Sequence, residues 1–322
     1  MIDAHLIGLD WGTTSLRAYL FESDGAIAAS RQLPAGIQRI GTEGGTTAGF
    51  ERALDEACGD WIAAWPGSPI IACGMIGSAQ GWREAAYLDI PTTLDDLGHA
   101  LTEVVIRSGA VLYIVPGLVQ RGSLPDVMRG EETQIAGVLS SEAPALTRCS
   151  TDMLICLPGS HAKWARVHDR AIVGFRTFMT GEVFAALCAH TLLGRTMRPA
   201  ATPDLEAFDR GVAIARSPDG RAGVLSTMFS TRTLGLVGAL AAEAQADYLS
   251  GLLIGHELAA LEQLGDRLDA VVLAGSDELC QRYRRALAGF GHAPAAIAID
   301  ATERGLWCVA RAAGLVSPGS IC

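Results

Sequence analysis

The sequence predicts an α/β fold built from two similar halves. Short apolar segments typical of buried strands alternate along the chain with longer segments of helical spacing. Each half opens in the same way, with an apolar strand, a polar turn and a second strand. At 322 residues the chain is longer than most single domains, so two domains are expected.

The first half opens with the stretch LIGLDWGTTSLRAYLFESDG, residues 6–25. Asp10 ends an apolar strand, and Gly12 permits a tight turn whose backbone N–H groups point inward. Thr13 and Thr14 add hydroxyl groups before a second strand begins. Such a turn suits phosphate oxygens, with Asp10 free to hold Mg²⁺. An ordinary β-hairpin is the alternative, and this stretch alone leaves both open.

The rest of the first half is expected to alternate between helices and strands. The expected helices cover residues 49–65, 94–109 and 131–141, and the expected buried strands cover 69–78 and 110–120. The pattern loosens around Pro144, so we expect the domain boundary between residues 145 and 146.

The second half repeats the opening logic in residues 152–178, where the turn Gly159-Ser160-His161 joins two strands. The segments that follow are expected to form helices and strands in turn. Helices are expected in 181–194, in a long stretch that runs through 248–265, in 277–291 and in a final helix through 304–316, and strands in 268–276 and 295–300.

Composition and charge limit the classes of function. Hydrophobic residues make up 49% of the chain and charged residues 19%, which is enough for a large core. The net charge of −10 argues against a nucleic-acid partner. We find neither an apolar segment long enough to span a membrane nor an N-terminal targeting pattern, so we expect a cytoplasmic protein with no membrane partner. The eight cysteines lack metal-ligand spacing, which suits reduced thiols.

Three motifs, in order, resemble those of the superfamily that contains actin, sugar kinases and Hsp70-type proteins. LDWGTTSLRAYLF looks like its first phosphate motif, CLPGSHAKWARV like the second, and VVLAGSDEL like the adenosine motif. Within the superfamily, PDVMRGEETQIAG, LPGSHAKW and FMTGE resemble the 2-dehydro-3-deoxygalactonokinases. The resemblance implies two ribonuclease-H-like (actin-like ATPase) domains with an ATP cleft between them. Residues 1–145 would form the sugar-acid side and residues 146–322 the nucleotide side.

The resemblance also implies a reaction. ATP would phosphorylate the terminal hydroxyl of 2-dehydro-3-deoxy-D-galactonate to give the 6-phosphate, in galactonate catabolism. The expected cofactors are ATP and Mg²⁺, and the expected partners are the sugar acid and, for the chain itself, a second copy in a homodimer. Phosphoryl transfer needs positioning, charge neutralisation and a base for the hydroxyl proton.

The resemblance places the phosphate contacts of the first half in the opening turn. Asp10 would hold Mg²⁺ through water, and Gly12, Thr13 and Thr14 would lie against the transferred phosphoryl group. Arg17 stands where related carbohydrate kinases carry an arginine that approaches the phosphate. The alternatives are a core-facing Thr14 and a solvated Arg17.

In the second half, Gly159, Ser160 and His161 would form the other phosphate turn. A structural role for His161 is the alternative. Gly275 and Ser276 end an apolar strand and begin a helix, where backbone can approach adenosine and the α-phosphate. The alternative there is a plain strand–helix turn with Ser276 as N-cap.

The catalytic base has two candidates. Glu131 aligns with the aspartate of a Gly-Asp-Gln segment in glycerol- and gluconate-type kinases, and is one carbon longer. Asp126 lies in an Asp-Val loop similar to the one that carries the base in hexokinases. A third interpretation gives Asp126, Glu131 and Glu132 only a favourable interaction with the helix dipole.

A keto sugar acid carries a carboxylate, so an acidic protein needs a local cation to bind it. Arg83 is the first candidate, because guanidinium can bind carboxylate through two bonds and because related kinases place an Arg-Glu pair there, matched by Arg83 and Glu84. Arg129 is the second candidate. Trp11 and Trp82 would line the sugar pocket, unless they are simply core.

Three other functions compete with this one. The chain could be a kinase for another keto sugar acid or a ketose. It could also be a non-kinase actin-like ATPase, or a transcription regulator built on a kinase fold. The chain carries no added peptide-binding domain, basic patch or helix-turn-helix pattern to favour the non-kinase classes.

Overall fold

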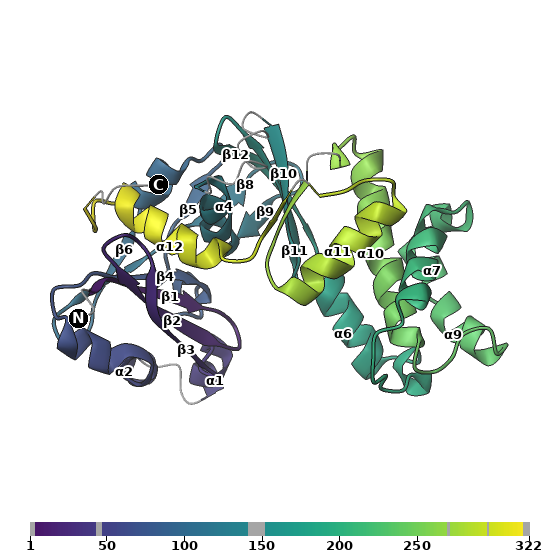
Figure 1. The fold of residues 1–322 in the computed structure, drawn as a ribbon, viewed down its shortest axis with the longest axis horizontal. Coiled ribbons are helices and arrows are strands. Elements are labelled where there is room, and N and C mark those ends of the chain that lie inside the picture. Colours follow the sequence, from purple (N-terminus) through teal and green to yellow (C-terminus); the bar gives the residue numbers. More distant parts are fainter. Residues whose placement is uncertain (1–3, 43–46, 141–151, 269–270, 295, 318–322) are drawn as a thin grey trace. The chain divides into compact units, whose positions relative to one another are not determined.

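The computed structural model describes residues 4–42, 47–140, 152–268, 271–294 and 296–317 (Figure 1). The chain divides into two compact units. The first comprises Met1–Asp152, Arg166–Phe175 and Asp300–Cys322, and the second comprises Met153–Ala165 and Arg176–Ile299. The expected boundary at 145/146 lies outside the described residues. The last segment of the chain packs with the first unit, although it follows the second in sequence.

A sheet of six strands, in the order β3-β2-β1-β4-β7-β6, forms the centre of the first unit. The strands are β1 (Ala4–Trp11), β2 (Leu16–Glu22), β3 (Ile27–Leu33), β4 (Ile70–Gly74), β6 (Thr102–Val105) and β7 (Val111–Ile114). Strands β1, β2 and β3 form antiparallel pairs, whereas β1, β4 and β7 run parallel. Asp24 closes the β2–β3 turn, since its Oδ1 accepts the Ala26 N–H at 2.9 Å and Gly25 adopts a φ of 85°.

The other large sheet has the corresponding order, β12-β11-β10-β13-β14. Its strands are β10 (Asp152–Leu157), β11 (Ala162–His168), β12 (Ala171–Phe178), β13 (Val271–Ala274) and β14 (Ala296–Ala298). Strands β10, β13 and β14 run parallel, as β1, β4 and β7 do. The expected α/β fold with two ribonuclease-H-like halves is therefore confirmed.

The helices of the first unit cover its sheet and a smaller one, ordered β5-β8-β9. The helices are α1 (Ile37–Thr42), α2 (Thr47–Ala64), α3 (Leu94–His99), α4 (Glu131–Leu139) and α12 (Ala301–Ala312), and the small sheet contains β5 (Tyr87–Asp89), β8 (Gly117–Gln120) and β9 (Asp126–Met128). Figure 1 shows α12, in yellow, among the purple and blue elements of this unit. Glycines let α12 approach α4 closely: a Cβ on Gly137 would lie 1.8 Å from the Ala301 carbonyl oxygen.

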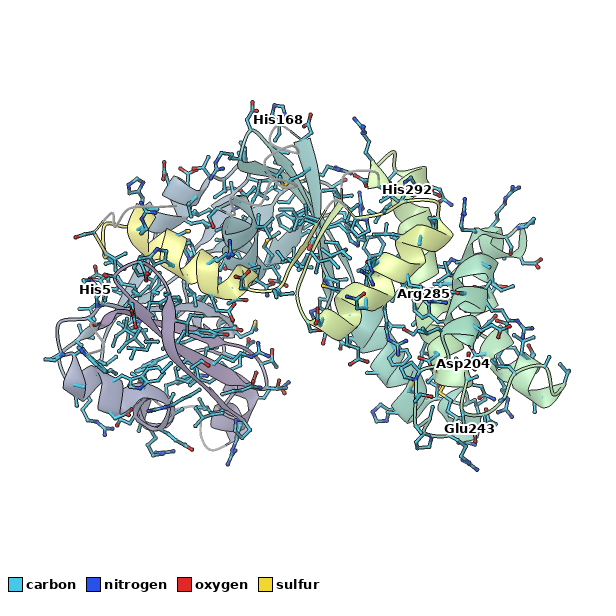
Figure 2. The ribbon with its side chains drawn as sticks, in the orientation of Figure 1. His5, His168, Asp204, Glu243, Arg285 and His292 are labelled. Atoms are coloured by element: carbon cyan, nitrogen blue, oxygen red, sulfur yellow. The ribbon has the colours of Figure 1, made fainter. Side chains whose placement is uncertain are left out.

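The second unit adds a group of helices to its sheet. They are α6 (Thr180–His190), α7 (Leu205–Arg216), α8 (Val224–Thr227), α9 (Ser230–Leu236), α10 (Gln245–Gln263) and α11 (Asp277–Gly289). Asp204, labelled in Figure 2, caps α7 by accepting the Ala207 N–H at 2.9 Å. Arg285 of α11, also labelled there, pairs with Asp209 of α7 through two bonds of 2.6 Å.

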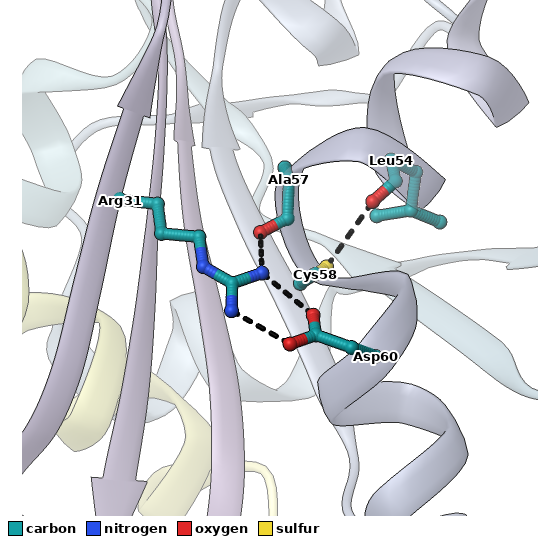
Figure 3. Close-up of polar contacts among 5 residues, drawn as sticks. All are labelled: Arg31, Leu54, Ala57, Cys58 and Asp60. Carbon is teal, nitrogen blue, oxygen red and sulfur yellow. Dashed lines mark hydrogen bonds and ion pairs between the residues drawn. The ribbon is translucent and has the colours of Figure 1, made fainter.

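A forked ion pair joins β3 to α2 at the edge of the first unit (Figure 3). The Arg31 guanidinium binds both oxygens of Asp60 at 2.6 Å and donates to the Ala57 carbonyl at 3.2 Å. These bonds meet α2 where its backbone leaves helical geometry, at Cys58. Burial raises the pKa of the Cys58 thiol to about 12, so this thiol stays protonated at neutral pH.

One expected helix and one expected strand differ from the structure. The segment expected as helix 94–109 ends its helix at His99 and continues as strand β6, because β-branched residues favour an extended strand there. The strand expected over 110–120 is divided into β7 and β8 at Pro116, which cannot donate a ladder hydrogen bond. The other expected elements agree within a few residues.

Within the described ranges, the helices are too short or too polar to cross a membrane.

Candidate functional site

Asp10 lies near the carboxyl end of β1, beside the end of β4. The parallel register places Asp10 opposite Cys73 and Trp11 opposite Gly74. The Arg17 Nη1 atom on the neighbouring strand lies 3.1 Å from the Asp10 Oδ2 atom. Burial raises the pKa of Asp10, and the Arg17 charge opposes this increase. The predicted metal-holding carboxylate is thus paired with the predicted phosphate-binding arginine.

The turn after β1 presents its threonines to solvent. Gly12 N donates to the Ser15 carbonyl at 2.9 Å, which closes the turn. The start of α1 is hydrogen-bonded to this turn, since Ile37 N donates to the Gly12 carbonyl at 3.1 Å. Thr13 and Thr14 are exposed, so the alternative in which Thr14 faces the core is wrong. Both hydroxyls are accessible to a ligand.

Two glycines bring the start of α4 close to Asp10. Gly74 has a φ of 91°, and a Cβ there would lie 2.8 Å from the Trp11 carbonyl oxygen and 3.7 Å from Asp10 Oδ1. Gly130 has a φ of 108°, and a Cβ there would lie 3.1 Å from the Gly74 Cα atom. Only glycine adopts these conformations without strain. The segment that carries Glu131 therefore begins beside the carboxylate of Asp10.

Glu131 and Glu132 begin α4 and have different environments. Glu131 is half-buried, and its Oε2 accepts the Arg129 N–H at 3.0 Å. Glu132 is fully buried, and its two oxygens accept the Gly130 N–H at 2.9 and 2.7 Å. Burial, and next the Glu131 charge, raise the pKa of Glu132 to about 7. Adjacent carboxylates look alike in a sequence, so the pattern predicts for Glu132 only a favourable interaction with the helix dipole and no role in the site.

Asp126, the other candidate for the base, starts β9. It is half-buried and its Oδ1 accepts the N–H of its neighbour Val127 at 2.8 Å. Strand β9 leads directly into Gly130 and α4, so both candidates lie on one short segment of the first unit. The structure leaves the choice between Glu131 and Asp126 as a prediction.

The predicted substrate-binding residues divide into buried and exposed groups. Arg129 is only 8% exposed, with Nη2 donating to the Ala85 carbonyl at 2.8 Å and the guanidinium lying over the Tyr87 ring. Its Nη1 is buried without a hydrogen-bond partner among the described residues. Trp11 is fully buried and donates to the Ala35 carbonyl at 2.8 Å. Trp11 therefore exposes no surface to a substrate, and Arg129 exposes very little.

Arg83, Glu84 and Trp82 lie on the segment that Arg129 holds. Arg83 and Glu84 are exposed, and Arg83 forms no ion pair with the residues that the structure describes. Asp89, the nearby acidic residue on β5, instead binds Arg121 at 2.6 Å. Trp82 is partly buried and packs in the core cluster of the first unit.

The turn predicted to bind phosphate in the second unit is held by the start of α6. Glu182 N donates to the Ser160 carbonyl at 3.0 Å. A Cβ on Gly181 would lie 2.4 Å from the Gly159 carbonyl oxygen, so the helix approaches the turn as closely as glycine permits. His161 Nε2 lies 2.5 Å from Glu182 Oε2. Ser160, in the middle of this turn, is exposed.

Gly275 and Ser276 lie beside that turn, at the end of the adjacent parallel strand. Gly275 has a φ of 147°, and a Cβ there would lie 3.6 Å from the Pro158 carbonyl oxygen. Ser276 is the N-cap residue of α11, but its side chain makes no capping hydrogen bond. The five predicted nucleotide-binding residues of the second unit therefore adjoin one edge of its sheet.

Asp10 fits a magnesium site in which the bound substrate supplies most of the ligands. The described residues contain no group of three or more His, Cys, Asp or Glu side chains that could hold a metal. Mg²⁺ in phosphoryl-transfer enzymes is bound by one or two carboxylates together with substrate phosphates. Asp10, at an exposed turn lined with hydroxyls, fits that kind of site.

Comparison with known proteins assigns the chain to a family. Residues 10–309 match the 2-keto-3-deoxy-galactonokinase family. The chain is 38% identical over 312 residues to a probable 2-dehydro-3-deoxygalactonokinase of Rhizobium meliloti (strain 1021), covering 94% of this chain and 96% of that protein. It is 34% identical over 311 residues to the 2-dehydro-3-deoxygalactonokinase of Escherichia coli (strain K12), covering 96% and 98%.

A solved structure agrees. A crystal structure of a candidate 2-dehydro-3-deoxygalactonokinase from Sinorhizobium meliloti superposes with a TM-score of 0.83 at 36% identity, covering 96% of this chain and 99% of that one. The match in sequence and in structure extends over nearly the whole chain. The chain belongs to the 2-keto-3-deoxy-galactonokinase family.

Proposed function

We propose that the protein transfers the γ-phosphoryl group of ATP to the terminal C6 hydroxyl of 2-dehydro-3-deoxy-D-galactonate. The product is the 6-phosphate, formed in galactonate catabolism. Relatives that cover nearly the whole chain are named for this kinase activity, which supports the substrate.

The convergence of Asp10, Gly74 and Gly130 carries the proposal. Two glycines with positive φ bring the helix start that bears Glu131 against the strand end that bears Asp10. A phosphoryl-transfer site needs a carboxylate for the metal near a carboxylate for the substrate proton, and this packing supplies both in one unit. An ordinary β-hairpin would not need either glycine.

Each residue has a role in the proposed reaction. Glu131 takes the proton from the C6 hydroxyl, with Asp126 as the alternative base. Gly12, Thr13 and Thr14 lie against the transferred phosphoryl group, and Arg17 neutralises its charge. Arg83, with Glu84, binds the carboxylate end of the sugar acid through its exposed guanidinium. Trp82 lines the sugar site, while Arg129 and Trp11 hold the surrounding backbone in position.

The second unit binds the nucleotide in this proposal. Backbone N–H groups and the Ser160 hydroxyl contact its phosphates, with His161 as a further donor. Gly275 and Ser276 leave room for adenosine and the α-phosphate at the start of α11. Asp10 would hold Mg²⁺ through water, and the ion would neutralise phosphate charge when bound.

We also infer that the protein acts in the cytoplasm as a homodimer. The six described cysteines are free thiols, which suits a reducing compartment. Leu225, Leu236 and Val237 expose most of their side chains, and exposed large apolar residues are typical of associating surfaces.

Release of ADP tests the substrate. Purified protein is mixed with ATP, Mg²⁺ and 2-dehydro-3-deoxy-D-galactonate, with the gluconate epimer as control. Rapid release with the galactonate epimer alone supports the proposal, and release with both widens the specificity. A folded protein that binds ATP but releases ADP with neither epimer would refute the named substrate and leave another keto sugar acid or a ketose. ATP hydrolysis without any sugar acid would favour a non-kinase ATPase.

Replacement of the base tests the mechanism. Glu131→Gln should lower kcat by orders of magnitude with little change in ATP affinity, because the amide cannot accept the hydroxyl proton. Asp126→Asn serves as the matched variant on the same segment. Near-normal turnover in Glu131→Gln, together with loss in Asp126→Asn, would move the role to Asp126.

A further inference from the structure

A buried carboxylate in the second unit has no part in the proposed chemistry. Glu257, in the middle of α10, is 2% exposed. A buried carboxylate is costly unless its oxygens are hydrogen-bonded. The donors that meet Glu257 are therefore informative about what this residue does.

Three neutral side chains from three other elements donate to Glu257. Trp164 of β11 donates through Nε1 at 2.5 Å, and the Tyr283 hydroxyl of α11 lies 3.1 and 2.9 Å from the two oxygens. Thr180, the first residue of α6, donates through Oγ1 to Oε2. Trp164 and Tyr283 lie in the hydrophobic core of the unit, whereas Thr180 is only half-buried.

The bond to Thr180 leads directly to the turn predicted to bind phosphate. Gly181 fits against the Gly159 carbonyl, and Glu182 N donates to the Ser160 carbonyl at 3.0 Å. Any movement of the α6 start along its axis would therefore displace the turn. Of the three bonds to Glu257, only the one from Thr180 fixes that start.

We propose that Glu257 is a positioning residue for nucleotide binding, which acts through Thr180 to hold the start of α6 against the turn Gly159–His161. The proposal rests on the proposed function, in which this turn contacts the nucleotide phosphates. Glu257 itself touches no phosphate. The Trp164 and Tyr283 bonds hold the carboxylate in place in the core. The Thr180 bond holds the start of α6 to this carboxylate, and the start of α6 in turn packs against the turn.

The test measures ATP affinity by calorimetry, together with the melting temperature and the KM of the sugar acid. Thr180→Val removes the hydroxyl that joins the start of α6 to Glu257 and should weaken ATP binding about tenfold, with the melting temperature and sugar-acid KM nearly unchanged. Thr180→Ser keeps the hydroxyl and should restore affinity. Trp164→Phe removes a core bond to Glu257 and should lower the melting temperature without this loss of affinity. Glu262→Gln, an exposed carboxylate on the same helix, should match the wild type.

A double-mutant cycle separates positioning from direct contact by Thr180. If Thr180 acts through Glu257, the variant with both Glu257→Gln and Thr180→Val binds ATP no more weakly than the worse single variant. Additive losses would show that Thr180 contacts the nucleotide itself and would overturn the proposal. Unchanged ATP affinity in Thr180→Val would also overturn it, and this arm does not depend on Glu257→Gln folding. Wild type that binds no ATP would instead refute the nucleotide site of the proposed function.

Discussion

Glutamine in place of Glu132 should change how the stability of the first unit depends on pH. Burial holds the pKa of Glu132 at about 7 in the folded protein, against an ordinary value of 4.5. A carboxyl whose pKa is raised by folding favours the folded state while it is protonated. This favourable contribution is complete below about pH 4.5 and is lost as the pH rises through 7.

The magnitude follows from the size of the shift. With these two pKa values, the wild type should lose about 2 to 3 kcal/mol of unfolding free energy between pH 5 and pH 8 through Glu132 alone. Glu132→Gln is neutral at both pH values and should lack this loss. The difference in stability between the two proteins should therefore shift by that amount in favour of the variant as the pH rises.

Tryptophan fluorescence is a suitable assay, because five of the six tryptophans belong to the first unit: Trp11, Trp61, Trp65, Trp82 and Trp307. Urea unfolding is followed at several pH values, with chelator present so that no metal contributes. Glu56→Gln, an exposed carboxylate of the same unit, is the control and should give a curve parallel to the wild type. Parallel curves for Glu132→Gln as well would refute the reasoning.

Three further predictions concern the first unit. Gly137→Ala should lower the stability of the first unit by about 3 kcal/mol, because the new Cβ would lie 1.8 Å from the Ala301 carbonyl oxygen. Gly67→Ala is the control in the same thermal melts and should be tolerated, because a Cβ there would meet no atom within 4 Å. Arg83→Ala should raise the sugar-acid KM at least tenfold and leave the ATP KM unchanged; equal effects on both would remove Arg83 from the carboxylate site. Arg129→Met should free the backbone around Ala85, and limited proteolysis should then cut that segment faster; unchanged cleavage would count against its supporting role.

The sequence predicts the sheets better than the details of the site. Strands such as β1 and β10 are continuous apolar segments followed by glycine-containing turns, and this local signal is strong. Segment 94–109 misled the prediction, because its apolar spacing is compatible with a helix as well as a strand. Pairing of β6 with β7 decides between them, and pairing is a long-range property that local spacing does not contain.

The site shows the same limit at the level of single side chains. Asp10 and the threonines are identifiable from their motif. The different environments of Glu131 and Glu132 depend on the φ of Gly130 and on the packing of Gly74 against it, which no local pattern specifies. In the sequence Arg129 looks like a cation that could bind a substrate. In the structure its guanidinium is buried and donates to the carbonyl of Ala85, a residue far away along the chain.

The place of α12 has a consequence for synthesis of the protein. The last helix packs against α4, so the first unit is incomplete until the ribosome has made about 150 further residues of the second. At typical elongation rates this interval is roughly 10 to 30 s. During that time the glycine face of α4 has no covering helix, and the nascent chain exposes apolar surface. The second unit, by contrast, is finished before α12 emerges, so we expect the part made later to reach its native state first.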